Sequence, residues 1–113
     1  MKEFTINGNK YNSVPFTFNL MCDLEDMGTP IETADSRPTS VLRSYFALCG
    51  NMGKDAAGKE IEEHLIKGGT LNELSDAFGK ELDESDFFRA LGETEEKENP
   101  TGAEQEKKTK AYK

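Results

Sequence analysis

The sequence predicts a small, mainly α-helical domain of the α+β class, in which a short N-terminal β-hairpin precedes four to five helices. Three observations predict this fold: an early two-residue turn between alternating residues, apolar residues that recur every three or four positions, and glycines where those runs stop. The 113 residues suffice for one domain, which we place at residues 1–92. A polar segment, residues 93–113, follows it.

Residues 2–14 are expected to form the hairpin. Phe4 and Ile6 alternate with polar neighbours, which is the pattern of a half-buried strand. Asn7 and Gly8 follow, and both residues adopt positive φ readily, as a two-residue hairpin turn requires. The chain should therefore reverse at this pair.

Apolar periodicity predicts four helices and a short final helical turn. The first run ends at Gly28 and the third at Gly68 and Gly69, where a C-terminal glycine is common. The second run has a wide apolar arc, which indicates a central position. The expected helices cover residues 17–27, 38–50, 56–67 and 71–82, with the short turn at 86–91.

Hydroxyl and carboxylate side chains precede several of these runs and are candidate helix caps. Thr17, Asp55 and Ser85 are expected at N-cap positions, where a side-chain oxygen accepts a hydrogen bond from a backbone amide. Thr70 and Glu73 have the spacing of a capping box, in which each side chain bonds to the other's backbone.

The segment 93–113 contains six glutamates and five lysines, with Tyr112 as its single aromatic residue. Such a segment buries too little apolar surface to offset the entropy lost on ordering. We therefore expect a disordered tail.

Composition excludes some classes of partner. A net charge of −8 argues against nucleic acid, because duplex binding needs a basic face. There is no apolar stretch near 20 residues, and no signal peptide is expected, so we predict no membrane partner. Cys22 and Cys49 lie in apolar helical patterns and are expected to be buried free thiols, which suits a reducing cytoplasm.

Chemically reactive groups are sparse. His64 is the only histidine, and Glu60 lies one helical turn before it, but two ligands do not make a metal site. The neighbouring glutamates are expected to form a solvated face. The acidic clusters lack the apolar setting that separates two carboxyl pKa values, and no phosphate-binding glycine loop is present. We therefore predict no catalytic residue, no metal and no cofactor, and hence no enzyme.

Two pairs of adjacent aromatic residues are the candidate partner-binding residues: Tyr45 with Phe46, and Phe87 with Phe88. Neighbours on a helix point about 100° apart, so both members of a pair cannot face one narrow core stripe. Either one member of each pair is exposed and binds a partner, or both lie in a broad core.

The order of these signals resembles the small tail assembly chaperones of siphophages and related prophages. The similarity covers nearly the whole chain, including a Lys/Glu-rich end. It is carried by the segments Phe4–Tyr11, Phe18–Gly28, Tyr45–Cys49, Gly58–Gly69 and Glu84–Leu91.

The resemblance implies a non-enzymatic chaperone that binds the tape-measure protein and keeps it soluble until the tail tube polymerises. It implies action in the bacterial cytoplasm and absence from the mature virion. In such families a ribosomal frameshift produces a longer form, which recruits the major tail tube protein. An exposed apolar patch would also allow copies of this chain to associate into a homo-oligomer. The alternative function is an acidic inhibitor or nucleic-acid mimic that binds a basic host protein.

Overall fold

The structure is a computed structural model that describes residues 2–98. Its elements confirm the predicted fold class, a hairpin followed by helices. In order they are β1 (Glu3–Ile6), β2 (Asn9–Asn12), α1 (Phe18–Asp26), the 3-10 turn η1 (Ile31–Thr33), α2 (Pro38–Gly50), α3 (Lys54–Ile66), α4 (Asn72–Glu84) and α5 (Asp86–Glu98).

The hairpin turns where the sequence predicts it. Ile6 pairs with Asn9, which leaves Asn7 and Gly8 as the two-residue loop. Their φ angles of 54° and 82° are both positive, as a type I′ turn requires. Phe4 and Ile6 are buried, so one face of β1 lies on the core.

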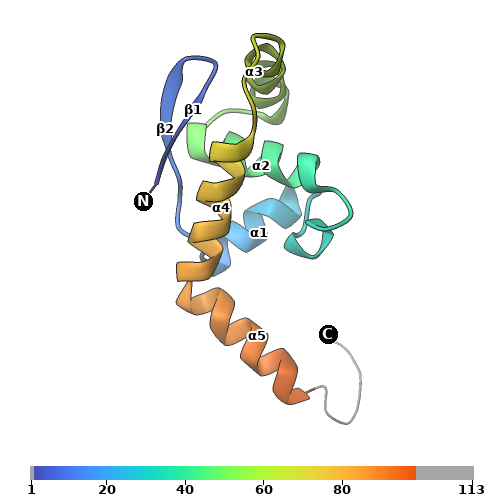
Figure 1. Cartoon of the computed structure of the whole chain (residues 1–113). Helices are drawn as coiled ribbons and strands as arrows, with labels where there is room; N and C mark the ends of the chain where they lie inside the picture. Colours follow the sequence, from blue (N-terminus) through green and yellow to red (C-terminus); the bar gives the residue numbers. More distant parts are fainter. Residues whose placement is uncertain (1, 99–113) are drawn as a thin grey trace.

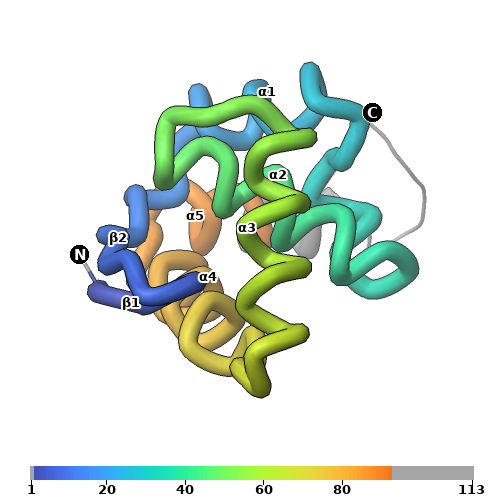
Figure 2. Tube along the Cα trace, turned by 90° about the horizontal axis from the view of Figure 1, so that it is seen from above, coloured from blue at the N-terminus to red at the C-terminus, as the bar shows by residue number. Residues whose placement is uncertain are grey.

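Helix α2 is the centre of the domain, as its wide apolar arc predicts. It contacts α1, α3, α4 and β2. Figure 1 shows α4 and the hairpin on one side of it, and Figure 2 shows α3 crossing over it. Buried residues from β1, α1 and α4 surround its apolar face, among them Ile6, Leu24, Leu74 and Phe78.

Several predicted helix signals are confirmed. The Thr17 side chain accepts the Leu20 N–H at 3.1 Å, and Ser85 Oγ accepts the Phe88 N–H at 2.9 Å, so both residues cap helices. Gly28 and Gly68 follow the ends of α1 and α3 with φ of 85° and 96°. That left-handed conformation favours glycine.

Two predicted caps are wrong. Asp55 lies inside the first turn of α3, and the N-cap is Gly53. The capping box is also not formed, because Glu73 Oε1 accepts the Thr5 N–H of β1 at 2.9 Å instead of turning back to its own helix. An unpaired strand amide competes successfully for this carboxylate.

The last helix is longer than predicted. Instead of a short turn ending at residue 91, α5 runs to Glu98 and so crosses the expected domain boundary at 92. Glutamate, alanine and leucine are strong helix formers, so a helix capped by Ser85 continues through this polar stretch by helix propensity. The rest of the expected tail, residues 99–113, lies outside the described residues.

Candidate functional site

Tyr45 and Phe46 do not form a partner surface. Both residues are 0% exposed, so of the two alternatives the broad core holds for this pair, and the selection of Tyr45 and Phe46 as partner-binding residues is wrong. Phe46 packs edge-on against Tyr11 with ring centroids 4.9 Å apart, and Tyr45 lies 4.4 Å from Phe78. The hairpin covers one side of α2 and α4 another, so the core is broad enough for two adjacent aromatic rings.

The Tyr45 hydroxyl is a structural link to the chain after the hairpin. It donates to the Val14 carbonyl at 2.8 Å and accepts the Val14 N–H at 3.0 Å. Burial raises the pKa of Tyr45 above its ordinary value of 10.0, so the phenol stays protonated and keeps its donor.

Phe87 and Phe88 are half-buried, and they meet the segment before α1. Phe16 is buried and contacts both of them, Phe87 in a stacked arrangement at 6.2 Å and Phe88 edge-on at 5.3 Å. Phe18 lies edge-on to Phe87 at 5.7 Å. The four phenylalanines therefore form one continuous aromatic cluster.

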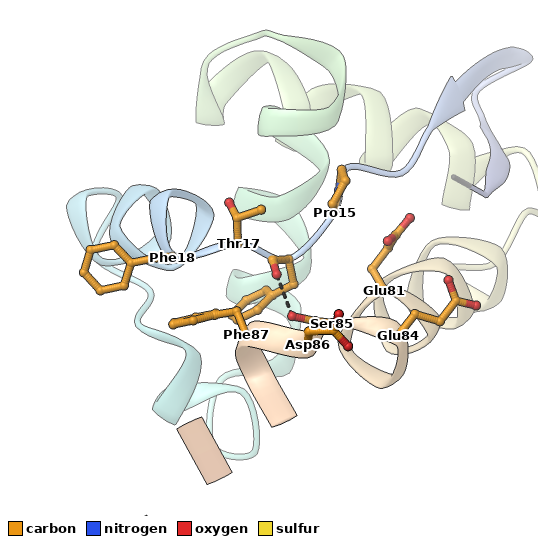
Figure 3. A pocket seen from close by; sticks show the side chains of 9 residues that line it. Pro15, Thr17, Phe18, Glu81, Glu84, Ser85, Asp86 and Phe87 are labelled. Atoms are coloured by element: carbon orange, nitrogen blue, oxygen red, sulfur yellow. Dashed lines mark hydrogen bonds between the residues drawn. The ribbon is translucent and has the colours of Figure 1, made fainter. Parts of the chain in front are cut away.

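A groove of about 400 Å³ runs beside this cluster. We call it the aromatic groove; it lies between the start of α1 and the junction of α4 with α5, and Figure 3 shows Phe18 and Phe87 toward one end and Glu84 toward the other. Its lining residues are Pro15, Phe16, Thr17, Phe18, Glu81, Glu84, Ser85, Asp86 and Phe87.

Ser85 holds the two walls of the aromatic groove together. Its hydroxyl donates to the Phe16 carbonyl at 2.7 Å while its oxygen accepts the Phe88 N–H. One buried side chain thus caps α5 and fixes the segment before α1 against it. The groove is preformed rather than dependent on a ligand to close it.

Phe18 is a candidate partner-binding residue that the sequence reasoning missed. It is 57% exposed, although it is a large apolar side chain. The signal was present in the sequence, because Phe18 is two positions before the buried Leu20 and so points to the opposite side of α1. Exposed aromatic rings beside a groove are typical of protein interfaces.

The rim of the aromatic groove is acidic. The Glu84 carboxylate accepts a hydrogen bond from Lys2 Nζ at 2.7 Å, which lowers the pKa of Glu84 below 4.5. The same bond raises the pKa of Lys2 above 10.5. Asp86 pairs with Arg89 at 3.0 Å. Both pairs are largely exposed to solvent, so they tune local charge more than stability.

His64 and the glutamates before it hold the hairpin turn. Asn7 donates its backbone N–H to His64 Nδ1 at 3.0 Å, and its side-chain amide donates to Glu60 at 3.1 Å and Glu63 at 2.8 Å. His64 Nε2 lies 2.9 Å from the Thr70 carbonyl. Both ring nitrogens are engaged, which requires the tautomer with the proton on Nε2. The expectation of a solvated glutamate face is therefore wrong for Glu60, which is half-buried, whereas Glu62 and Glu63 are exposed as predicted.

Other carboxylates are similarly engaged within the fold. Glu73 binds the edge of β1, and the buried Glu81 carboxylate accepts the Ser13 hydroxyl. A phosphate mimic needs a continuous face of free carboxylates, so these contacts weigh against that alternative. Among the side chains that the structure describes, residues 2–92, groups of three or more potential ligand side chains arranged around a metal position are absent.

The two cysteines are free thiols, as predicted, but both are half-buried rather than buried. Burial raises the pKa of Cys49 from its ordinary value of 9.0 to about 11. A thiol with a raised pKa holds little thiolate at neutral pH and is a poor nucleophile.

Cys49 should therefore react slowly with iodoacetamide in the native protein. At pH 8 the change from 9.0 to about 11 lowers the thiolate fraction about 100-fold, so alkylation should slow by at least that factor relative to the protein in urea. Peptide mass spectrometry over time measures it. Equal rates in the folded and unfolded protein would contradict the raised pKa of Cys49.

Comparison with protein-family models, curated proteins and solved structures gave no match. Function therefore has to be argued from the aromatic groove and the sequence. Among the helices of the described residues, none is both long and apolar enough to cross a membrane.

Proposed function

We propose that this protein is a non-enzymatic chaperone for phage tail assembly, which binds an apolar helical segment of the tape-measure protein in its aromatic groove. It acts in the host cytoplasm, keeps the tape measure soluble until the tail tube polymerises, and is absent from the mature virion. A frameshifted longer form would bring in the major tail tube protein.

The observation that carries this proposal is the exposure of Phe18 beside Phe87. A free monomer gains nothing from leaving 57% of a phenylalanine in water, whereas a partner that covers the exposed part gains about 1–2 kcal/mol, roughly half the value for a fully exposed side chain of this size. Aromatic residues with such exposure are common binding hot spots. The sequence resemblance supplies the identity of the partner.

The net charge of −8 supports the same role. A chaperone that covers apolar helices of a long partner must keep the complex in solution, and like charge on successive bound copies opposes their aggregation.

Co-expression with the tape-measure protein of the neighbouring reading frame tests the proposal. In a pull-down through the tape measure, Phe18→Ser should reduce the retained protein more than tenfold, which corresponds to about 1.4 kcal/mol. Its free energy of unfolding should change by less than about 0.5 kcal/mol, because an exposed ring contributes little to the folded state.

Ile66→Ser is the matched control, since Ile66 is 75% exposed on α3 and lies outside the aromatic groove. This variant should be retained like the wild type. Retention of Phe18→Ser together with loss of Ile66→Ser would place the binding surface on α3 and contradict the proposal. Sedimentation of both variants alone shows whether Phe18 instead joins copies of this chain.

A further inference from the structure

A second, smaller pocket lies between α2 and α3. Its volume is about 240 Å³, and we call it the Arg43 pocket. Figure 1 shows α3 and α5 at opposite ends of the molecule, so this pocket is separate from the aromatic groove. The residues that carry the argument are Thr39, Ser40 and Arg43 on α2, with Ile61, Leu65 and Leu71 as its apolar wall.

Arg43 has an unsatisfied buried donor. Its Nε atom is buried and has no hydrogen-bond partner within the described part of the chain. The ion pairs among the side chains of residues 2–92 join Lys2 to Glu84 and Arg89 to Asp86, so within that range Arg43 has no carboxylate partner. Buried polar groups are nearly always paired, and an unpaired one in an acidic protein needs an explanation.

Two hydroxyl donors line the same pocket as the Arg43 guanidinium. Thr39 and Ser40 lie four and three positions before Arg43, so all three residues share one face of α2. The N-cap of α2 is Arg37, whose side chain makes no capping hydrogen bond within the described residues. Hydroxyls, a guanidinium and the positive end of a helix together favour an oxyanion.

The apolar wall and the size of the pocket select the kind of oxyanion. Sites for free metabolites usually measure about 300–1,000 Å³ and enclose the ligand, whereas this pocket is smaller and has aliphatic side chains on one side. Leu65 is 45% exposed, so part of this apolar wall is open to a partner. These properties fit one acidic side chain on an otherwise apolar segment.

We infer that the Arg43 pocket binds the carboxylate of a glutamate or aspartate on an apolar helix of a partner protein. Because Nε is shielded from solvent in the free protein, the Arg43 side chain has to rotate toward the pocket, where the guanidinium meets the carboxylate with parallel N–H donors. The hydroxyls of Thr39 and Ser40 are then available to the remaining oxygen lone pairs. The partner's flanking apolar residues cover Leu65. This inference is independent of the function proposed for the aromatic groove.

The test uses a blocked helical peptide of about 16 residues, long enough to form a helix. It carries one central glutamate with a leucine one turn before and after it, in an alanine and glutamine background. Its twin has glutamine in place of the glutamate. Titration of the isotope-labelled full chain, followed by amide chemical shifts, should show the glutamate peptide binding at least about tenfold more tightly than its twin.

The shifts should centre on Arg43 and Leu65. Arg43→Gln should abolish the difference between the two peptides, while Arg43→Lys should keep part of it, because lysine supplies charge without the planar pair of donors. Leu65→Asn should weaken both peptides alike. Arg89→Gln is the matched control and should bind like the wild type, because Arg89 lies on α5 and pairs with Asp86.

Equal affinity for the two peptides would overturn the inference, as would a preference for glutamate that persists in Arg43→Gln. Shifts confined to Phe18 and Phe87 would assign the peptide to the aromatic groove instead. A parallel titration with inorganic phosphate should leave the Arg43 amide unchanged at concentrations where the peptide saturates. Tighter binding of phosphate would make this a free-anion site and overturn the inference.

Discussion

Phe46→Ala is expected to lower the free energy of unfolding by about 3–5 kcal/mol, because it removes a fully buried ring and leaves a cavity that the neighbouring side chains fill only in part. Phe46 packs against Phe4 and Tyr11 of the hairpin, so the cavity would lie between α2 and both strands. Domains of this size are stable by about 5–15 kcal/mol, and the loss would be a large part of that total.

Phe18→Ala is the control for the same chemical change at an exposed ring. Its effect on the free energy of unfolding should stay within about 0.5 kcal/mol. Urea unfolding followed by circular dichroism measures both variants under one set of conditions. Similar losses for the two would mean that Phe18 is packed in solution, and would remove the basis for the aromatic groove as a binding site.

Gly69→Ala is expected to cost about 2–3 kcal/mol, because the added Cβ would collide with the ring of His64. The ring would have to move away from both of its partners, the Asn7 N–H and the Thr70 carbonyl. Each lost hydrogen bond contributes about 0.5–1.5 kcal/mol, and the amide left behind is partly buried. The hairpin turn would then lose a main contact with α3.

Gly79→Ala is the matched control, since a Cβ at Gly79 meets nothing within 4 Å and the residue lies inside α4. It should stabilise the domain by about 0.5–1 kcal/mol through helix propensity. Urea unfolding gives the stabilities, and amide hydrogen exchange at Asn7 reports the local contact. If Gly69→Ala leaves exchange at Asn7 unchanged, His64 does not hold the turn.

Combining Gly69→Ala with His64→Ala tests the mechanism. If the alanine acts only by displacing the imidazole, the double variant should be no less stable than His64→Ala alone. Additive losses would show that Gly69 contributes independently of His64.

The sequence by itself determined the element order and most element limits. Asn7 and Gly8 specify a hairpin turn through their own conformational preferences. Thr17 and Ser85 each cap the helix that follows by accepting the backbone N–H three residues later. Apolar periodicity located the helices, because it depends only on the 3.6-residue repeat. The sequence-based prediction made α5 too short, because it gave the scarcity of apolar residues after residue 91 more weight than the helix propensity of that stretch. Both properties can be read from the sequence.

Only the tertiary structure decided which side chains are free to meet a partner. Glu73 forms no capping box because Thr5, distant in sequence, offers it an unpaired amide, and Glu60 and Glu63 are engaged by Asn7 for the same reason. Exposure follows likewise from what each side of a helix packs against. The hairpin covers Phe46 and α4 covers Tyr45, whereas Phe18 extends beyond the elements that bury Leu20. Periodicity gives the direction of a side chain relative to its own helix, and long-range packing decides whether another element covers it.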